Sequence, residues 1–421
     1  MKGASSFFIA LRYLLGRAKE GGRYLRGAAA GIAISLVPIM VTLIVADGMI
    51  RGITSRYLEL GTGHLQVYDL TNASEIEEVR DAIASLDGVR GVWPERQSLG
   101  VLLGKHGRTG TTIRAADPPL WEDEGSRSFL LTLEGSSELQ SSREVLLGEE
   151  LARNIGASAG DTIRLMTVRI ASDGRNIPRM TPLQVKGIVS SGYRELDSLW
   201  CIMDYQLGKD VLSQELSSTF LMVKVDDPYG NIEAQAFRIS SMLGKGYGVY
   251  TWKSLQRSQY SSYESTRQLL LFIMALIVIV AAVNVSSATS MLVIERRRDI
   301  ALFKSIGASP RFICRIFLHA SFLTGLIGAA AGSVLGLLIG AHINPIIHAL
   351  ESLLGFFSRF FNGGEVKILD PGYYLENIPI LIDWFTAALI FIFTVIASIL
   401  ASWIPAHRTG KISPLELMRK Y

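Results

Sequence analysis

The sequence predicts a membrane α-helical protein with four transmembrane helices and a large α+β domain outside the membrane. Four apolar runs occupy residues 27–50, 268–294, 317–343 and 384–404. Each run is long enough to span a bilayer, which takes about 20 residues. The chain is also 49% hydrophobic and yet 19% charged. That mixture is too apolar for an ordinary soluble protein and too charged for an all-membrane one.

The distribution of Lys and Arg predicts the topology. Basic residues outnumber acids six to one in the N-terminal segment 1–26, six to two in the link 295–315 and four to one in the tail 405–421. Acids prevail, five to two, in the loop 344–383. Short cytoplasmic segments carry the basic excess. We therefore expect both termini and the link 295–316 in the cytoplasm, with 51–267 and 344–383 outside.

The first apolar run requires a choice between a cleaved signal peptide and a spanning helix. The run starts late, is long, and lacks an Ala-x-Ala-like cleavage site with a polar exit. An uncleaved spanning helix fits these features better.

The outside segment 51–267 contains a weak internal repeat of strand, helix and strand. Two such units, separated in sequence, predict a split α+β subdomain over about 64–115 and 216–257. The two copies are His64–Asp69, Ser74–Leu86 and Val89–Trp93, then Phe220–Val225, Tyr229–Leu243 and Tyr247–Trp252.

Residues 116–215, between the two copies, are rich in strands and turns. They predict an inserted, mostly β subdomain. Its expected elements are the strands Val145–Leu147, Thr162–Met166, Leu183–Val189 and Leu199–Met203, with a helix at Glu149–Ile155.

Motifs for catalysis do not fit their context. Gly156-Ala-Ser-Ala-Gly160 matches a nucleophile elbow, but a helix precedes it and a strand follows, which reverses the required order. The sequence has no P-loop, so we expect no unaided ATP hydrolysis. The six histidines are scattered, which argues against a metal site. The two cysteines, Cys201 and Cys314, are expected on opposite sides of the membrane, where they cannot pair.

Two features within the apolar runs predict helix packing. Glycines recur at every fourth position of the third run, a spacing that allows another helix to approach closely, within or between protomers. They are Gly328, Gly332, Gly336 and Gly340. Polar residues at 284–290 of the second run favour hydrogen bonds between helices over a transport pathway. No charged residue lies in the core of a run, which argues against an ion-coupled carrier.

The link 295–316 carries its own short amphipathic helix. Ile300, Leu302, Phe303 and Ile306 are its apolar positions, and Gly307 supplies a C-terminal stop. Ser309 and Pro310 then fit the N-cap and first position of the next helix. A capped helix along the inner membrane surface indicates a docking site for a cytosolic partner.

These residues resemble a known family. Glu295-Arg-Arg-Arg-Asp-Ile-Ala-Leu-Phe-Lys-Ser-Ile-Gly-Ala-Ser309 is similar to the coupling-helix motif of FtsX/MacB-type ABC permeases, and Pro405-Ala-His-Arg-Thr-Gly-Lys-Ile-Ser-Pro414 to their closing motif. Three further segments resemble the LolC/LolE lipoprotein-releasing branch: Leu146-Leu-Gly-Glu-Glu-Leu-Ala-Arg-Asn-Ile-Gly156, Ile188-Val-Ser-Ser-Gly-Tyr-Arg-Glu-Leu-Asp197 and Asp370-Pro-Gly-Tyr-Tyr-Leu-Glu-Asn-Ile-Pro379.

The resemblance implies a non-catalytic permease subunit in the bacterial inner membrane. Two permeases, identical or paralogous, would sit on two ABC ATPase subunits that bind ATP and Mg, with no cofactor in this chain and no nucleic acid as partner. The complex would extract lipoproteins and pass them to a periplasmic chaperone. The residues expected to contact the ATPase are Arg296, Arg298, Ile300, Leu302, Phe303, Lys304, Ile306 and Gly307.

The resemblance also implies where substrate and chaperone bind. Acyl chains would lodge between the first two helices of the permeases, on the apolar residues Val37, Met40, Val41, Ile44, Leu271, Met274, Ile277 and Val278. A chaperone-binding hook would correspond to about 170–182, with contacts at Arg175, Pro178, Met180 and Pro182. The segment is shorter than in the LolC member, and its elements differ in order and spacing, so whether it forms a hook stays open. The choice between a LolC-like, a LolE-like and a single permease also stays open.

Two other functions share the same membrane core. A MacB-like efflux permease usually carries a fused N-terminal ATPase domain, whereas only 26 residues precede the first run here. An FtsX-like signal transmitter would activate a partner through a much smaller outside domain. A structural membrane protein outside the ABC class would have no use for the capped cytoplasmic helix.

Overall fold

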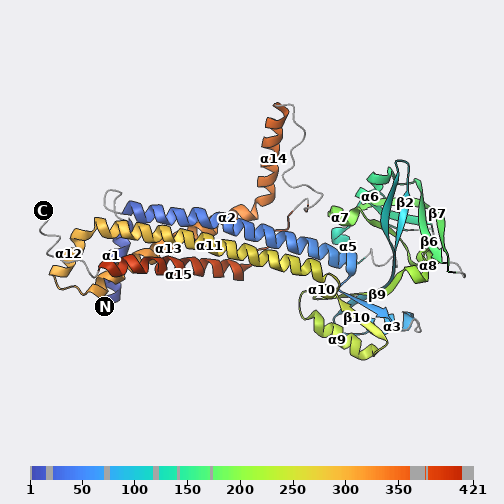
Figure 1. The fold of residues 1–421 in the computed structure, drawn as a ribbon, viewed down its shortest axis with the longest axis horizontal. Coiled ribbons are helices and arrows are strands. Elements are labelled where there is room, and N and C mark those ends of the chain that lie inside the picture. Colours follow the sequence, from blue (N-terminus) through green and yellow to red (C-terminus); the bar gives the residue numbers. More distant parts are fainter. Residues whose placement is uncertain are drawn as a thin grey trace. The chain divides into compact units, whose positions relative to one another are not determined.

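The computed structural model describes residues 2–15, 22–70, 76–116, 123–139, 143–170, 174–360, 375 and 378–409. The chain divides into two units (Figure 1). A helical unit comprises Met1–Met49, Tyr263–Val366 and Ile378–Tyr421, and an α/β unit comprises Ile50–Ser262 with Lys367–Asn377.

The helical unit contains four helices long and apolar enough to cross a membrane, and they contain or overlap the four predicted runs. Within this unit they run alongside one another (Figure 1). They are α2 (Gly22–Arg56), α11 (Arg257–Glu295), α13 (Pro310–Ala341) and α15 (Trp384–Arg408). Three further helices were only partly expected: α1 (Lys2–Leu15) and α14 (Ile343–Phe360) were not predicted, and α12 (Arg297–Ser305) is the predicted short helix of the link.

Two apolar clusters hold the helical unit together. One joins α2, α11, α13 and α15 along the bundle and includes Leu36, Val278 and Ile390. The other joins α1 and α12 to the ends of the bundle helices through Tyr13 and Ile300. Polar side chains add to the first cluster, since Thr289 Oγ1 of α11 lies 2.9 Å from Ser321 Oγ and 3.3 Å from Ser402 Oγ. The predicted hydrogen bonding between helices is thereby confirmed at this position.

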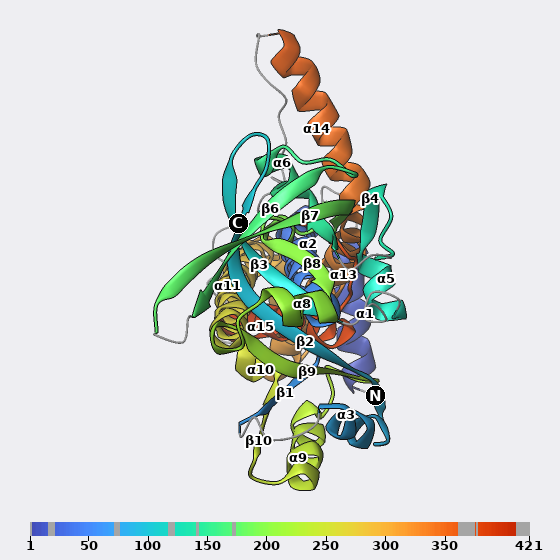
Figure 2. The same cartoon turned by 90° about the vertical axis from the view of Figure 1, so that its right-hand side faces the viewer.

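The α/β unit is built on one ten-stranded sheet (Figure 2). Its strands follow the order β10-β1-β9-β2-β3-β8-β5-β7-β4, and β6 pairs with β2 and β7. The strands are β1 (Leu65–Asp69), β2 (Val89–Leu103), β3 (Arg108–Ala116), β4 (Leu131–Gly135), β5 (Glu144–Gly148), β6 (Thr162–Ile170), β7 (Asn176–Ser190), β8 (Trp200–Asp204), β9 (Ser218–Val225) and β10 (Tyr247–Thr251).

Helices and short turns connect these strands. After α2 the chain continues as a π-helix, η1 (Tyr57–Thr62), and a 3-10 helix, η2 (Gln214–Leu216), precedes β9. The α-helices are α3 (Ile76–Ala84), α5 (Glu124–Phe129), α6 (Glu149–Ile155), α7 (Arg194–Asp197), α8 (Tyr205–Val211), α9 (Ile232–Leu243) and α10 (Trp252–Leu255).

Two hydrophobic clusters lie along the sheet. One gathers α3, α9, β1, β9 and β10 around residues such as Ile83, Val223 and Ile239. The other gathers β3, β5, β6, β7 and β8 with α6 and α8. Strand β2 contributes to both, with Val92 in the first and Leu102 in the second.

The predicted repeat elements are all present as strand, helix and strand, although residues 74 and 75 of the expected first helix lie outside the described residues. The expected boundary between subdomains was residue 116. Strand β3 lies before that boundary, yet its Ile113 and Ala115 belong to the cluster of the inserted part. The apolar cores therefore separate along β2 rather than after β3.

Candidate functional site

The glycines of α13 form a ridge, Gly328, Gly332, Gly336 and Gly340, that lies against α2. A Cβ at Gly328 would stand 2.7 Å from the carbonyl oxygen of Ala29, and one at Gly332 would stand 2.8 Å from that of Ala33. Those distances are shorter than real Cβ contacts. Only glycine permits this approach of the two helix backbones.

The same close packing buries part of the surface expected to bind acyl chains. Met40 and Ile44 of α2 lie where Cβ atoms at Gly336 and Gly340 would stand, and both are at most 2% exposed. On α11, Met274 and Val278 are buried in the bundle cluster. These four residues therefore offer no surface in this structure.

The other four expected acyl-chain residues remain accessible. Val37, Val41 and Leu271 are half-buried, and Ile277 is 37% exposed. The most exposed apolar residues in this part of α11 lie on a different face of the helix from the expected ones and are 43–63% exposed. They are Leu269, Phe272, Ile273, Leu276, Ile279, Val280 and Val283.

One polar feature at the end of the bundle where α15 begins was not expected from the sequence. The Arg267 guanidinium of α11 lies with Nε 2.9 Å from Asp47 Oδ1 of α2 and donates from Nη2 to Asp383 Oδ2 at 2.8 Å. Asp383 also caps α15, accepting hydrogen bonds from the Phe385 and Thr386 backbone amides. We call Asp47, Arg267 and Asp383 the outer charged cluster. The sequence does contain a signal for this cluster, since Arg267 directly precedes one apolar run and Asp47 and Asp383 lie at the ends of two others.

At the other end of the bundle, α12 is a capped helix with one buried and one exposed face. The C-terminal stop is confirmed: Gly307 has φ +87°, its amide donates to Lys304 O, and the Ala308 amide donates to Phe303 O. These two bonds form a Schellman motif. The predicted cap of α13 is also confirmed, because Ser309 Oγ accepts from the Phe312 amide.

The α12 side chains divide into an anchoring set and an exposed set. Ile300 is only 1% exposed and packs in the cluster with α1, whereas Leu302 and Ile306 are 55% and 77% exposed. Phe303 and Lys304 are half-buried, and Arg298 is exposed.

A polar contact fixes this arrangement of α12. Tyr13 of α1 donates to Asp299 Oδ2 at 3.4 Å, and the Arg296 guanidinium carbon lies 5.0 Å from the centre of the Tyr13 ring. Of the eight residues expected to meet an ATPase, Leu302, Ile306, Arg298 and Gly307 are exposed, while Ile300 serves the packing of α12.

In the α/β unit, the segment expected to bind a chaperone is part of a long β6–β7 hairpin. The two strands pair from Thr162↔Gln184 to Ile170↔Asn176, and residues 171–173 between them lie outside the described residues. Arg175, Pro178, Met180 and Pro182 are all exposed.

The hairpin also exposes apolar side chains, with Ile177 at 52% and Met180 at 48%. Residues 174–180 are exposed on both faces of β7, so neither face of this part of the strand packs against a core. This part of the hairpin is thus available to a partner.

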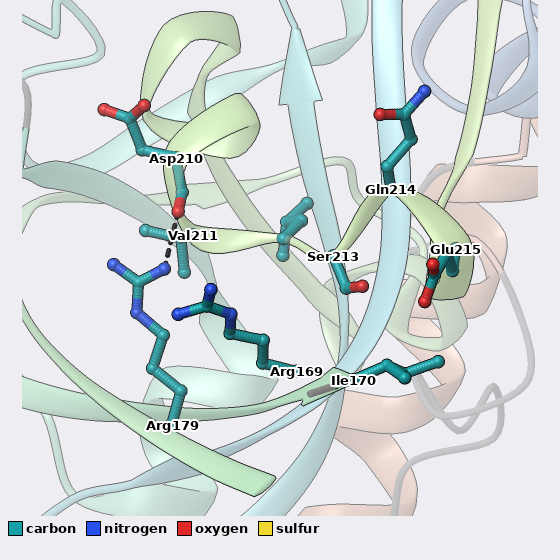
Figure 3. A pocket seen from close by; sticks show the side chains of 9 residues that line it. Arg169, Ile170, Arg179, Asp210, Val211, Ser213, Gln214 and Glu215 are labelled. Carbon is teal, nitrogen blue, oxygen red and sulfur yellow. Dashed lines mark hydrogen bonds between the residues drawn. The ribbon is translucent and has the colours of Figure 1, made fainter. Parts of the chain in front are cut away.

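A polar cavity of about 670 Å³ lies beside the hairpin (Figure 3). Arg169 of β6 and Arg179 of β7 both line it, and Arg179 Nη1 donates to the Asp210 carbonyl at 2.6 Å. Among the described residues, neither arginine forms an ion pair with an acidic side chain. Asp210 and Glu215 also line the cavity, so residues of both charge signs meet there.

Buried charges secure the start of the α/β unit. Lys224 Nζ, fully buried, lies 3.0 Å from Glu59 Oε2 and 2.8 Å from Asp123 Oδ2. His64 lies 3.3 Å from the other Glu59 oxygen and accepts a hydrogen bond at Nδ1 from the Val225 amide. Burial alone would raise the pKa of Glu59, but the His64 hydrogen bond and the Lys224 charge outweigh it and lower that pKa to about 2.

A second buried pair joins η1 to the sheet. The Arg114 guanidinium donates to both carboxylate oxygens of Glu95, at 2.6 and 2.9 Å, and both side chains are almost fully buried. Arg114 also donates to the Leu60 carbonyl of η1. The π-helix is therefore anchored by side chains from the strands that follow it.

Comparisons with known proteins match two consecutive segments of the chain to family models and nearly the whole chain to relatives. The family model for the FtsX-like permease C-terminal matches residues 271–414, and that for the MacB-like periplasmic core domain matches residues 27–236. The lipoprotein-releasing system transmembrane protein LolC of Neisseria meningitidis serogroup B is 24% identical over 419 residues, covering 98% of each chain. LolE of Haemophilus influenzae is 22% identical over 426 residues, covering 99% of each.

Among solved structures, the periplasmic region of MacB from Actinobacillus actinomycetemcomitans is 16% identical. It covers 48% of this chain and 95% of that one, with a TM-score of 0.31. The two family models follow one another along the chain and together take in all four apolar helices. This chain therefore belongs to the FtsX- and MacB-like permeases of ABC transporters, and lipoprotein-releasing transmembrane proteins are among its full-length relatives.

Proposed function

We propose that this chain is a permease subunit of an ABC transporter that extracts lipoproteins from the inner membrane and hands them to a periplasmic chaperone. ATP hydrolysis would take place in a separate ATPase subunit, bound in two copies under two permeases. The observation that carries the proposal is that similarity to lipoprotein-releasing proteins extends over 98–99% of the chain. It includes the α/β unit as well as the permease helices.

The topology follows from the basic segments. With both termini and α12 in the cytoplasm, the α/β unit would be periplasmic, divided into the two subdomains predicted for it. The outer charged cluster would then mark the periplasmic end of the spans, where charged side chains belong at a membrane boundary.

Contact with the ATPase would be made by the exposed face of α12. Leu302 and Ile306 are large apolar side chains that are 55% and 77% exposed. Burying either in a groove contributes about 1.5–3 kcal/mol. Ile300 and the Tyr13–Asp299 contact would hold α12 to the bundle, so that a movement of the ATPase is passed to the spans.

The acyl chains would meet the accessible surface formed by Val37 and Val41 of α2 with Leu271 and Ile277 of α11. The exposed α11 residues Phe272, Leu276 and Val280 extend that surface. Each acyl methylene that leaves hydrocarbon for water costs about 0.8 kcal/mol, so the chains stay in the bilayer or on this apolar surface unless work is done. Extraction from the membrane is then the costly step, which gives ATP hydrolysis its role.

Chaperone contact would involve the exposed hairpin strand 175–182. Its apolar side chains Ile177 and Met180 suit a surface that itself accepts lipid, and the adjacent cavity, lined by two arginines and two acids, suits polar groups on the same partner. Apolar anchors beside charged groups are a common composition of transient interfaces.

Photo-crosslinking tests the extraction function. A photo-reactive amino acid at Ile277 should trap a lipoprotein before ATP is added and lose it afterwards. The same amino acid at Leu389, an exposed residue of α15, serves as the control and should trap only phospholipid. Phospholipid adducts at both positions, unchanged by ATP, would favour a signal transmitter and contradict extraction.

A further inference from the structure

Helix α14 is an 18-residue helix outside the four spans of the helical unit. It follows α13 after a break at His342, whose backbone amide donates hydrogen bonds to the carbonyl oxygens of Ile339 and Gly340. In Figure 1, α14 runs across the direction shared by α2, α11, α13 and α15, and Figure 2, viewed from another side, shows it projecting away from them. A helix in that direction lies parallel to a membrane that the bundle crosses.

The base of α14 is fixed to the bundle. Asn344 donates from Nδ2 to the Ile378 carbonyl at 3.0 Å and accepts from the Ile378 amide at 3.1 Å. The next residue, Pro379, packs on Gly48 of α2, where any Cβ would collide with the Pro379 carbonyl oxygen. Gly48 directly follows Asp47 of the outer charged cluster. The base of α14 is therefore level with the charged end of the bundle.

The length of α13 also places the base of α14 at the membrane boundary. At 1.5 Å per residue its 32 residues extend about 48 Å. A bilayer measures about 40–45 Å with its headgroup regions included. The junction at His342 therefore falls at the outer headgroup region, where α14 begins.

The sequence of α14 is amphipathic. Apolar residues recur with the spacing of one helix face, and four of them are 37–54% exposed: Ile346, Leu350, Leu353 and Leu354. The opposite face carries His348, Glu351 and Ser352, and His348 Nδ1 lies 3.5 Å from Glu351 Oε2. An exposed apolar stripe of this kind on a helix needs a covering surface.

We propose that α14 lies in the plane of the membrane, at the outer leaflet, with Ile346, Leu350, Leu353 and Leu354 buried among the acyl chains and the His348–Glu351–Ser352 face in water. The direction of α14, the level of its base and its exposed stripe all fit this position. Among its described side chains, the polar face carries the acid Glu351 and neither Lys nor Arg, so apolar burial rather than attraction to anionic headgroups holds the helix there. The proposal holds for any permease with this bundle, whatever its substrate.

Fluorescence quenching in proteoliposomes tests this position. A solvatochromic cysteine label at Leu353, and separately at Ser352, is placed in the full chain with Cys201→Ala and Cys314→Ala. We expect the label at 353 to be quenched by phospholipids with a doxyl group near the headgroup and protected from iodide. The label at 352, one residue away on the opposite face, should show the reverse.

Two results would overturn the proposal. Equal quenching of both labels by iodide would mean that α14 stands free in water. A label at 353 protected from both quenchers would mean that a protein, such as a second permease subunit, covers the stripe instead of lipid.

A pair of variants supplies a second readout, with the label at Ile346. Leu350→Asp with Leu353→Asp should reduce doxyl quenching at 346 and increase quenching by iodide. Ser352→Asp adds a charge to the polar face of the same helix and should change neither. Unchanged quenching in the double variant contradicts the proposal, and if that variant fails to insert, the two labels in the wild-type helix still decide.

Discussion

Arg267 of α11 and Asp47 of α2 form an ion pair, with Nε 2.9 Å from Oδ1, across 220 residues of sequence. The same guanidinium reaches Asp383, so three of the four apolar helices are tied together at one end. In the proposed topology this is the periplasmic end, beside the surface on which acyl chains would bind. The ion pair limits how far α2 and α11 separate there.

Removing this tie should loosen the bundle slightly. Arg267 is 40% exposed, so solvent screens both pairs and we expect Arg267→Gln to cost about 1 kcal/mol in all. The melting temperature in detergent, followed by tryptophan fluorescence, should fall by a few degrees. Arg257→Gln removes an exposed arginine from the same helix and is the matched control. Equal melting temperatures for the two variants would show that the cluster contributes nothing.

The glycine ridge predicts a strong difference between two Gly→Ala substitutions. A Cβ at Gly332 would stand 2.8 Å from the Leu36 Cβ, so α13 and α2 must move apart, at about 1–3 kcal/mol. At Gly31 of α2, no atom lies within 4 Å of an added Cβ. Gly31→Ala should therefore be neutral or slightly stabilising. Thermal unfolding in detergent distinguishes the two, and a neutral Gly332→Ala would contradict the observed helix contact.

The exposed face of α12 predicts which residues couple the permease to its ATPase. Leu302→Asp with Ile306→Asp should leave the permease inserted but abolish co-purification with the ATPase, since each lost apolar contact costs at least tenfold in affinity. Leu302→Met with Ile306→Leu keeps both positions apolar and should retain the ATPase. Co-purification that survives Leu302→Asp with Ile306→Asp would place the contact elsewhere.

The low pKa of Glu59 predicts a dependence of stability on pH. Its ordinary value is 4.5 and its folded value about 2. A depressed carboxyl pKa stabilises the fold fully above the unfolded value, and the contribution disappears as pH falls from about 4.5 through about 2. Glu59→Gln lacks this term, so the difference in melting temperature between wild type and variant should be constant above pH 5 and shrink below 4.5.

The Trp93 ring lies 5.7 Å from Lys224 Nζ, so one of the six tryptophans whose fluorescence follows unfolding lies at this site. A wild-type minus variant difference that stays constant down to pH 3 would contradict the role assigned to Glu59.

The spans and many strands were predictable because each is a continuous local pattern. An apolar run such as 317–343 needs no knowledge of its neighbours to be read as a spanning helix. The end of α12 and the start of α13 were predictable in the same way, because Gly307 is a typical helix C-terminal stop and Ser309 a typical N-cap.

The buried face of each span was not predictable in the same way. Lipid and bundle interior are equally apolar, so the period of apolar residues does not distinguish Met274, which is buried, from Phe272, which is 63% exposed. The glycine spacing predicted a close helix contact for α13 but did not identify α2 as the partner. Four of the eight expected acyl-chain residues are consequently in the bundle core.

Long-range contacts and edge effects account for the remaining differences. Strand β2 was expected to end at Trp93, before Pro94, yet it continues to Leu103. Strand β3 pairs with β2 only from Glu95 onward, so Pro94 lies where β2 has an open edge, which tolerates proline. The direction of α14 depends on the bonds between Asn344 and Ile378, 34 residues apart, and no local pattern contains it.

Transfer of a lipoprotein out of the membrane tests the central proposal most directly. The permease and its ATPase are reconstituted in vesicles with a fluorescent triacylated lipoprotein, and the soluble fraction is measured with the chaperone present. We predict release that requires ATP, that is lost with Leu302→Asp and Ile306→Asp, and that is retained with Leu302→Met and Ile306→Leu. ATP hydrolysis by the wild-type complex with all lipoprotein still in the vesicles would contradict the account.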